Sequence, residues 1–142
     1  MKRKQRGVTL IELMMVIAIV GVLSAIAIPT YHRYVVRSNR TDAKTALTQM
    51  AQRYERCYTN STPYAYDGAT CTATVTHPYT VDSGTYQIDA SFPTSQSYAL
   101  TATPQGAQFT DDTECGTFTL TQTGAQTVSG SLSATPERCW RR

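Results

Sequence analysis

Residues 7–29 of this chain read Gly-Val-Thr-Leu-Ile-Glu-Leu-Met-Met-Val-Ile-Ala-Ile-Val-Gly-Val-Leu-Ser-Ala-Ile-Ala-Ile-Pro. The stretch from Val8 to Ile28 is mostly apolar, and a helix of ~20 residues rising ~1.5 Å each would cross a hydrocarbon layer of ~30 Å. The residues before it carry four cations and no acidic group: Lys2, Arg3, Lys4 and Arg6. This bias predicts a membrane-spanning helix whose amino end stays in the cytoplasm, with the rest of the chain on the far side.

One acidic residue, Glu12, interrupts the apolar stretch. A carboxylate inside a membrane helix is unfavourable by roughly 2.5 kcal/mol or more, so such a residue is usually functional and has a partner. A cation would become available if the chain were cut after Gly7, because the new amine on Val8 would lie one helical turn from Glu12. The pairing is awkward within one subunit but natural between staggered neighbouring subunits.

Together these features resemble the type IV prepilin signature, which combines a basic leader, a glycine, a glutamate at the fifth position after it and an unbroken apolar run. The resemblance implies that a prepilin peptidase cuts between Gly7 and Val8 and methylates the amine of Val8. It also implies that Glu12 brings each subunit into register on the growing filament. Val8 is a departure, because the family more often has Phe or Met there.

Two other interpretations fit the amino end less well. A secretory signal peptide with Ala25-Ile26-Ala27 as its cleavage site would have a shorter apolar run, of ~7–15 residues, and no glutamate. A plain membrane anchor would require Glu12 only to reach toward the membrane surface. The prepilin interpretation is preferred because several independent features agree with it.

Length, charge and cysteine content bound the rest of the chain. A chain of 142 residues is expected to form one domain with a single core. Four of the thirteen Lys and Arg residues lie in the leader, so the mature chain is near neutral against ten Asp and Glu, without a strong electrostatic footprint for nucleic acid. The expected organisation is a leader at 1–7, a membrane and filament-core helix at 8–29 and a head at 30–142.

A second helical segment is expected beyond Pro29. Apolar residues recur there at spacings of four and three, which is one stripe of an amphipathic helix: Ala43, Leu47, Met50, Tyr54 and Cys57. Residues 60–63 should end the helix, and Pro29 should kink it near the membrane surface because proline lacks a backbone donor. In related pilins the segment between such a glycine and proline loses helical order in the filament, and Gly21 to Pro29 is the analogous stretch here.

The remaining residues predict an antiparallel meander. Residues 63–84 have no helical period and are expected to form an ordered loop. Apolar residues alternate with polar ones at 86–90, 98–102 and 115–121, and 126–129 is a plausible fourth strand. Turns are expected at Phe92–Ser95 and at Thr123-Gly124, and the tail after Gly130 has no period. The predicted fold class is therefore α+β, with a long helix packed on a small antiparallel sheet.

Four cysteines in an exported head indicate two disulfides, and the sequence alone leaves three connectivities open. Closing the shorter loops favours Cys57 with Cys71 and Cys115 with Cys139. The second pair also resembles the disulfide-bounded carboxy-terminal region of the pilin family. The segment 115–120, followed by Gly124 and Cys139-Trp140, is most similar to minor pilins of the PilE type.

No nucleophile, metal or phosphate motif is present, so neither an enzyme nor a cofactor is expected. His32 and His77 are interpreted as surface histidines. The acidic residues Asp111, Asp112 and Glu114 could hold Ca²⁺ or form a solvated turn. The end of the chain combines an aromatic residue with cations that could bind nucleic acid, or the tryptophan could simply pack on the head: Arg138, Trp140, Arg141 and Arg142.

The preferred interpretation is a structural subunit of a type IV pilus, most similar to a minor pilin. It would lie in the bacterial inner membrane and then in an extracellular filament, serving adhesion, twitching motility or DNA uptake. The implied partners are sister pilins, a prepilin peptidase and an inner-membrane assembly platform. A pseudopilin of a type II secretion system and a DNA-binding pilin remain alternatives, and weak DNA binding at most is expected of the head.

Overall fold

The structure, a computed structural model, describes residues 7–61, 63–68, 71 and 77–141. Helix α1 runs from Leu10 to Asn60 and contains both the apolar run and the amphipathic stripe seen in the sequence. By its internal contacts the chain divides into two units, Met1–Val35 and Val36–Arg142. The division falls within α1, between its apolar half and its amphipathic half.

The first unit consists of the apolar part of α1. Its large side chains are exposed all round the helix, including Leu10, Ile17 and Ile28. Among the described residues, this helix is long and apolar enough to cross a membrane. A helix that is apolar on every side needs lipid or other helices around it, as the sequence predicts for this segment.

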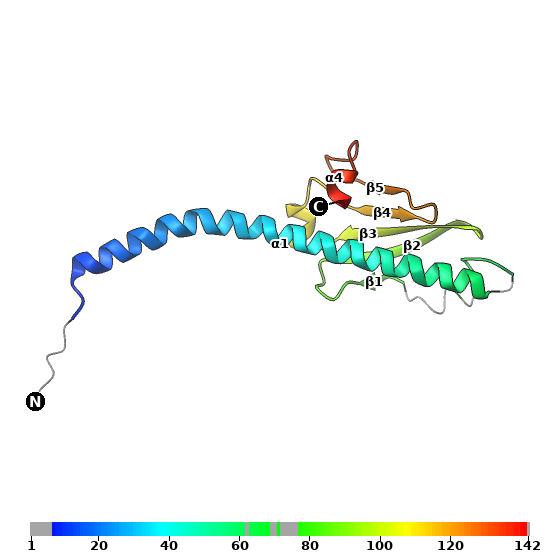
Figure 1. Ribbon diagram of the computed structural model, residues 1–142, viewed down its shortest axis with the longest axis horizontal. Coiled ribbons are helices and arrows are strands. Elements are labelled where there is room, and N and C mark those ends of the chain that lie inside the picture. The colour runs from blue at the N-terminus through cyan, green and yellow to red at the C-terminus, as the bar shows by residue number, and fades with distance from the viewer. Residues whose placement is uncertain (1–6, 62, 69–70, 72–76, 142) are drawn as a thin grey trace, which may run out of the picture. The chain divides into compact units, whose positions relative to one another are not determined.

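In the second unit, α1 lies along the sheet (Figure 1), and one stripe of its side chains is buried in the core. The buried residues are Val36, Ala43, Leu47, Met50, Tyr54 and Cys57. Five of these six are the stripe predicted from the sequence, and the helix ends at Asn60 as expected. Both predictions are confirmed.

The sheet has five antiparallel strands whose spatial order follows the chain. They are β1 (Tyr79–Thr80), β2 (Tyr86–Thr94), β3 (Ser97–Pro104), β4 (Phe118–Thr121) and β5 (Gln126–Val128). Two short helices, α3 (Ala107–Asp111) and α4 (Glu137–Trp140), lie after β3 and β5. The predicted α+β fold with an antiparallel meander is confirmed.

Alternating residues of the strands form the sheet side of the core. Tyr86 and Ile88 of β2 and Leu100 of β3 are fully buried, and Phe118 of β4 lies with them. The pairing of Leu100 with both Ala90 and Leu120 fixes the register between β2, β3 and β4. A one-residue slip would turn these side chains to the other face, so burial itself holds the register.

Some strand boundaries differ from those predicted. Strand β2 continues through Pro93 to Thr94, so the expected turn at Phe92–Ser95 is wrong. The proline lies where the register shifts between Ser91 and Thr94, and such an irregularity tolerates a residue without a backbone donor. Strand β4 begins at Phe118 rather than Cys115, because Gly116 has a positive φ of 62° that breaks the extended chain.

The tail after β5 is held by its backbone against the loop at 113–117. Gly130 donates to the carbonyl of Cys115 at 3.0 Å, and Leu132 donates to the carbonyl of Glu114 at 2.9 Å. The two segments approach so closely that a Cβ added at Gly130 would lie 2.3 Å from the carbonyl oxygen of Glu114. Only glycine allows this path, which apolar periodicity did not indicate.

Part of the predicted loop at 63–84 falls at residues 69–70 and 72–76, outside the described residues. Within that loop the structure contains β1, whose two residues are too few to give an alternating pattern. Tyr79 pairs with Ile88, which places β1 at the edge of the sheet.

Candidate functional site

The amino end of α1 places the predicted processing and assembly residues close together. Gly7 and Val8 precede the helix, and Val8 is 74% exposed. Glu12 lies in the first helical turn, where its backbone N–H donates to the hydroxyl Oγ1 of Thr9 at 3.3 Å. Thr9 therefore caps the helix. Threonine followed three residues later by glutamate is the sequence signal for such a cap.

Gly21 and Pro29 both lie inside α1, which continues through them. Pro29 leaves the carbonyl of Ala25 without its usual helical donor. One residue later, the hydroxyl of Thr30 donates to the carbonyl of Ile26 at 2.9 Å. The kink at Pro29 and the loss of helical order between Gly21 and Pro29 remain predictions about the filament.

The two disulfides tie the ends of the head to its core. Cys57 near the end of α1 is bonded to Cys71, and Cys115 is bonded to Cys139 of α4. This is the pairing that the sequence favours. The second bridge fixes α4 beside the start of the segment leading to β4.

Asp112 of the acidic cluster is not in the solvated turn expected from the sequence. Asp112 is 1% exposed, and both of its carboxylate oxygens accept hydrogen bonds from Arg40, at 2.9 and 2.8 Å. Oδ2 also accepts from the hydroxyl of Tyr86 at 2.8 Å, and Oδ1 accepts from the N–H of Cys115 at 3.1 Å. With its oxygens occupied in this way, Asp112 anchors the loop to α1. The neighbouring Asp111, in contrast, is exposed.

Burial and hydrogen bonding act in opposite directions on this ion pair. Burial would raise the pKa of Asp112, but the hydrogen bonds from Arg40 and Tyr86 outweigh burial and hold the pKa below its usual value. Burial would lower the pKa of Arg40, but the hydrogen bond to Asp112 and its charge raise the pKa. Both groups therefore stay charged near neutral pH.

The two histidines differ from each other. His32 is exposed on α1, as predicted. His77 is half-buried, stacks on Tyr54 with ring centroids 5.7 Å apart, and is hydrogen-bonded through Nε2 to the Tyr54 hydroxyl. The surface interpretation of His77 is wrong, because the sequence could not show that its ring packs on Tyr54 of α1. Among the residues that the structure describes, no group of three or more His, Cys, Asp or Glu could hold a metal ion.

The tail lies against α1 and packs on the head. The indole of Trp140 meets Phe118 edge to face at 5.4 Å, and its Nε1 donates to the carbonyl of Thr127 at 3.3 Å. Lys44 of α1 donates through Nζ to the carbonyls of Cys139 and Trp140, both at 3.3 Å. Lys44 thus places a cation at the carboxyl end of α4, where the last carbonyls need donors.

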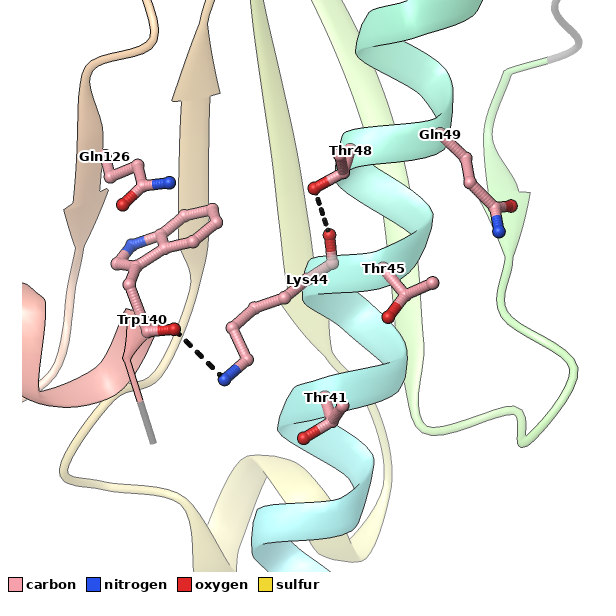
Figure 2. Close-up of a pocket in the computed structure, with 7 residues that line it drawn as sticks. All are labelled: Thr41, Lys44, Thr45, Thr48, Gln49, Gln126 and Trp140. Atoms are coloured by element: carbon pink, nitrogen blue, oxygen red, sulfur yellow. Dashed lines mark hydrogen bonds between the residues drawn. The ribbon is translucent and has the colours of Figure 1, made fainter.

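A polar groove of about 380 Å³ lies between α1 and the tail, as Figure 2 shows. Hydroxyl and amide side chains line it together with the ammonium of Lys44 and one side of the indole: Thr41, Lys44, Thr45, Thr48, Gln49, Gln126 and Trp140. Arg37 shares the α1 face of Thr41 and Lys44 by its spacing of four and seven residues. Arg138 is exposed on α4, and Arg141 is exposed directly after it. We call Arg37, Arg138, Arg141 and the groove the tail edge.

Cations are distributed unevenly over the head. From Cys57 to Glu137 the chain contains no lysine or arginine, so every strand and every connection between strands lacks these cations. The mature chain has them only on α1 and in the tail. Arg40 is paired with Asp112, and Lys44 is engaged with the tail carbonyls. The tail edge therefore holds much of the cationic charge that the head exposes.

Two protein families match the chain. Residues 2–28 match the prokaryotic N-terminal methylation motif. Residues 29–119 match the family described as type IV minor pilin ComP, DNA uptake sequence receptor. This second match covers more than half of the chain and contains most of the head, but it ends before the tail edge residues of β5 and α4.

Three curated pilus proteins are similar to part of the chain. A type IV major fimbrial protein FimA of Dichelobacter nodosus is 49% identical over 57 residues, which are 40% of this chain and 36% of that protein. Fimbrial protein EcpC of Eikenella corrodens is 58% identical over 43 residues, 30% of this chain and 28% of its own length. The type IV major pilin protein PilA of Myxococcus xanthus is 54% identical over 44 residues, 31% and 20% of the two chains.

The matched segments span between a fifth and about a third of the length of these relatives. The match to the minor pilin family covers residues 29–119, which include most of the head. A methylation motif, a long apolar helix and a disulfide-tied head on an antiparallel sheet occur together in one chain. This protein therefore belongs to the family of type IV minor pilins described as ComP, DNA uptake sequence receptor.

Proposed function

We propose that this protein is a minor subunit of a type IV pilus, held in the inner membrane by residues 8–29 and then assembled into the filament through the same helix. The observation that carries the proposal is that the two family matches follow each other without a gap, over 2–28 and 29–119. The work of such a subunit is assembly and not catalysis.

Processing would precede assembly. In this proposal a prepilin peptidase cuts between Gly7 and Val8 and the new amine of Val8 is methylated. The exposure of Val8 and the start of α1 at Leu10 support it, because the scissile bond lies in non-helical chain that a peptidase can bind. Sister pilins and an inner-membrane assembly platform are the further partners.

Glu12 would set the register of assembly. Alone in lipid, its carboxylate is unfavourable by roughly 2.5–3.5 kcal/mol, and pairing with the amine of a neighbouring subunit's Val8 would offset that cost. The pair can form only when neighbouring subunits are shifted along the filament axis by one particular distance. The pair would therefore fix the position of each new subunit relative to its neighbour.

The experiment compares membrane and sheared-filament pools of cells that carry Glu12→Ala, Glu12→Gln or the neighbouring control Leu13→Ala. Both Glu12 variants should insert and be processed normally, because each makes the segment more apolar and leaves Gly7 intact. We expect the Glu12 variants to be lost from the filament pool and Leu13→Ala to be retained. Normal filament yield from Glu12→Ala would mean that apolar packing suffices without the charge.

A second function, DNA binding, is favoured by the description of the matched family as a DNA uptake sequence receptor. Phosphate contacts supply most of the affinity of proteins for DNA, and they require Lys or Arg. Because residues 57–137 have neither, the sheet of this head is poorly suited to the task. The proposed contact is therefore the tail edge, which combines the exposed arginines Arg37, Arg138 and Arg141 with a groove lined by hydroxyl and amide groups.

Few phosphate contacts imply weak binding, in agreement with the expectation from the sequence. Each contact contributes about 0.9 to the slope of log affinity against log salt, so a slope of about −2 to −3 is expected. The soluble head from residue 30 would be titrated with labelled duplex DNA at several salt concentrations. Replacing Arg138 and Arg141 by Gln should reduce the slope by about 2, one for each phosphate contact.

The matched control replaces Arg53 and Arg56, which are exposed near the far end of α1. Arg53→Gln with Arg56→Gln removes the same charge and should leave the salt slope unchanged. Equal losses for both pairs would show that only net charge matters, and the absence of any binding at low salt would remove DNA from the functions of this chain.

A further inference from the structure

Beyond its apolar run, α1 carries a turn of different chemistry. Ile28 is the last residue of that run, and Tyr31, Arg33 and Tyr34 follow it within the first unit. Tyr31 and Tyr34 each leave 70% of their surface exposed, although tyrosine is more often packed at least in part. These rings must be covered by something outside the described chain, or they lie in water at some cost.

The arrangement of the three side chains suits a bilayer surface. Tyr31 and Tyr34 are three residues apart and therefore neighbours on one side of the helix, whereas Arg33 points to another side. Tyrosine is enriched at membrane interfaces because its ring is apolar and its hydroxyl is polar. A guanidinium binds phosphate in a bidentate manner, which an ammonium cannot do.

We propose that Tyr31, Arg33 and Tyr34 form an interfacial belt that binds anionic phospholipid headgroups on the far side of the inner membrane. The belt directly continues the membrane-spanning stretch, and Arg33 has the charge that complements a lipid phosphate. This inference rests on the membrane placement in the proposed function. The belt would hold the subunit at a defined depth in the bilayer until assembly removes it.

Binding of the belt to lipid headgroups has a consequence for assembly. A subunit held by a belt must release lipid headgroups when it enters the filament, so the belt opposes extraction. A cation near an anionic surface contributes about 1 kcal/mol, or about five-fold in occupancy, and this is small enough for an assembly machine to overcome.

The test uses the full chain reconstituted in phosphatidylcholine vesicles with or without phosphatidylglycerol. Tyr31→Trp reports the belt, Ile19→Trp reports the middle of the span, and Tyr64→Trp reports the head, where Tyr64 is 61% exposed. Trp140 is present in every sample, and its signal is subtracted with the unsubstituted chain. Lipids brominated near the headgroup or deep in the acyl chains quench each added indole.

We expect the Tyr31→Trp indole to be quenched mainly by the shallow bromines, the Ile19→Trp indole by the deep ones, and the Tyr64→Trp indole by neither. Phosphatidylglycerol should increase the shallow quenching of Tyr31→Trp. Arg33→Gln in the same chain should abolish that increase, whereas the control Arg53→Gln should preserve it.

Three results would overturn the proposal. If Tyr31→Trp resembles Tyr64→Trp, the belt lies in water. If phosphatidylglycerol has no effect, or has the same effect after Arg33→Gln, the arginine does not bind anionic lipid. If deep bromines fail to quench Ile19→Trp, the segment does not span the bilayer, and this failure belongs to the proposed function itself.

Discussion

The guanidinium of Arg40 and the carboxylate of Asp112 form a bidentate ion pair that joins α1 to the segment after α3, with N–O distances of 2.9 and 2.8 Å. The side chains are 11% and 0% exposed. The pair therefore replaces hydration that both groups lose on folding, and it fixes one end of the head to the helix. Glu114 adds a longer contact to the same guanidinium at 3.4 Å.

Removing the charge of Asp112 should strongly destabilise the head. Asp112→Asn keeps the shape but leaves a guanidinium that is largely buried without its main countercharge, a change that typically costs about 3–5 kcal/mol. Urea unfolding of the soluble head measures the effect. The exposed neighbour provides the control, because Asp111→Asn should change the free energy of unfolding by no more than about 0.5 kcal/mol. Similar losses from both variants would contradict the assigned role of Asp112.

The same pair predicts sensitivity to acid. The pKa of Asp112 is below its ordinary value of 3.8 in the folded head, because hydrogen bonds from Arg40 and Tyr86 outweigh burial. A carboxyl with a lowered folded pKa stabilises the fold above its unfolded pKa, and this contribution is lost as pH falls through the folded pKa. The wild-type head should therefore lose stability below about pH 3.8. Asp112→Asn should show a shallower dependence over that window in unfolding curves at several pH values.

The contact between the tail and the 113–117 loop should not tolerate a side chain at Gly130. Gly130→Ala would place a Cβ 2.3 Å from a backbone oxygen, where no flexible side chain can move aside. We expect a loss of about 1–3 kcal/mol, as for other cases of overpacking. Gly68→Ala is the control, since its nearest contact would be an ordinary 3.7 Å. A stability change at Gly130 as small as that at Gly68 would mean that the two segments separate easily.

The bridge between Cys115 and Cys139 should stabilise the head by restricting the unfolded chain. Replacing both cysteines by serine opens a loop with a sequence separation of 24 residues and should cost about 3 kcal/mol. The double variant avoids a free thiol and is compared with the wild type by unfolding under non-reducing conditions. Non-reducing peptide mapping of the wild type should recover Cys57 with Cys71 and Cys115 with Cys139, and any cross-pairing would contradict the path of the tail.

Processing predicts the mass of the mature chain. Intact-mass measurement of purified filaments should find a subunit that begins at methylated Val8. Gly7→Ala should be cleaved better than Gly7→Val, because the larger side chain hinders the peptidase at the scissile bond. A chain beginning at Ile28 would instead indicate signal-peptide cleavage, and an uncut Met1 would indicate a plain anchor.

The sequence predicted the features that depend on local pattern. The stripe from Ala43 to Cys57 and the strands around Ile88 and Leu100 follow from periodicity, because one face of each element is buried. The prediction failed where distant segments meet. The sequence near Asp112 does not indicate Arg40, and the sequence near His77 does not indicate Tyr54. The side chains of Asp112 and His77 are therefore expected in solvent, whereas each of them contacts a residue of α1. The path of the tail depends on backbone pairing at Gly130, which apolar periodicity cannot detect.

The absence of Lys and Arg from 57 to 137 also determines where proteases can cleave the head. An enzyme of the trypsin type requires a cation next to the bond it cuts, and between Arg56 and Arg138 it finds none. The strands would resist cleavage by such an enzyme even when unfolded, because they contain no lysine or arginine. A cut after Arg138 would still leave Cys139 attached through its disulfide to Cys115. Residues 57–138 would therefore remain one covalent piece after cuts by trypsin-like enzymes in α1 or in the tail.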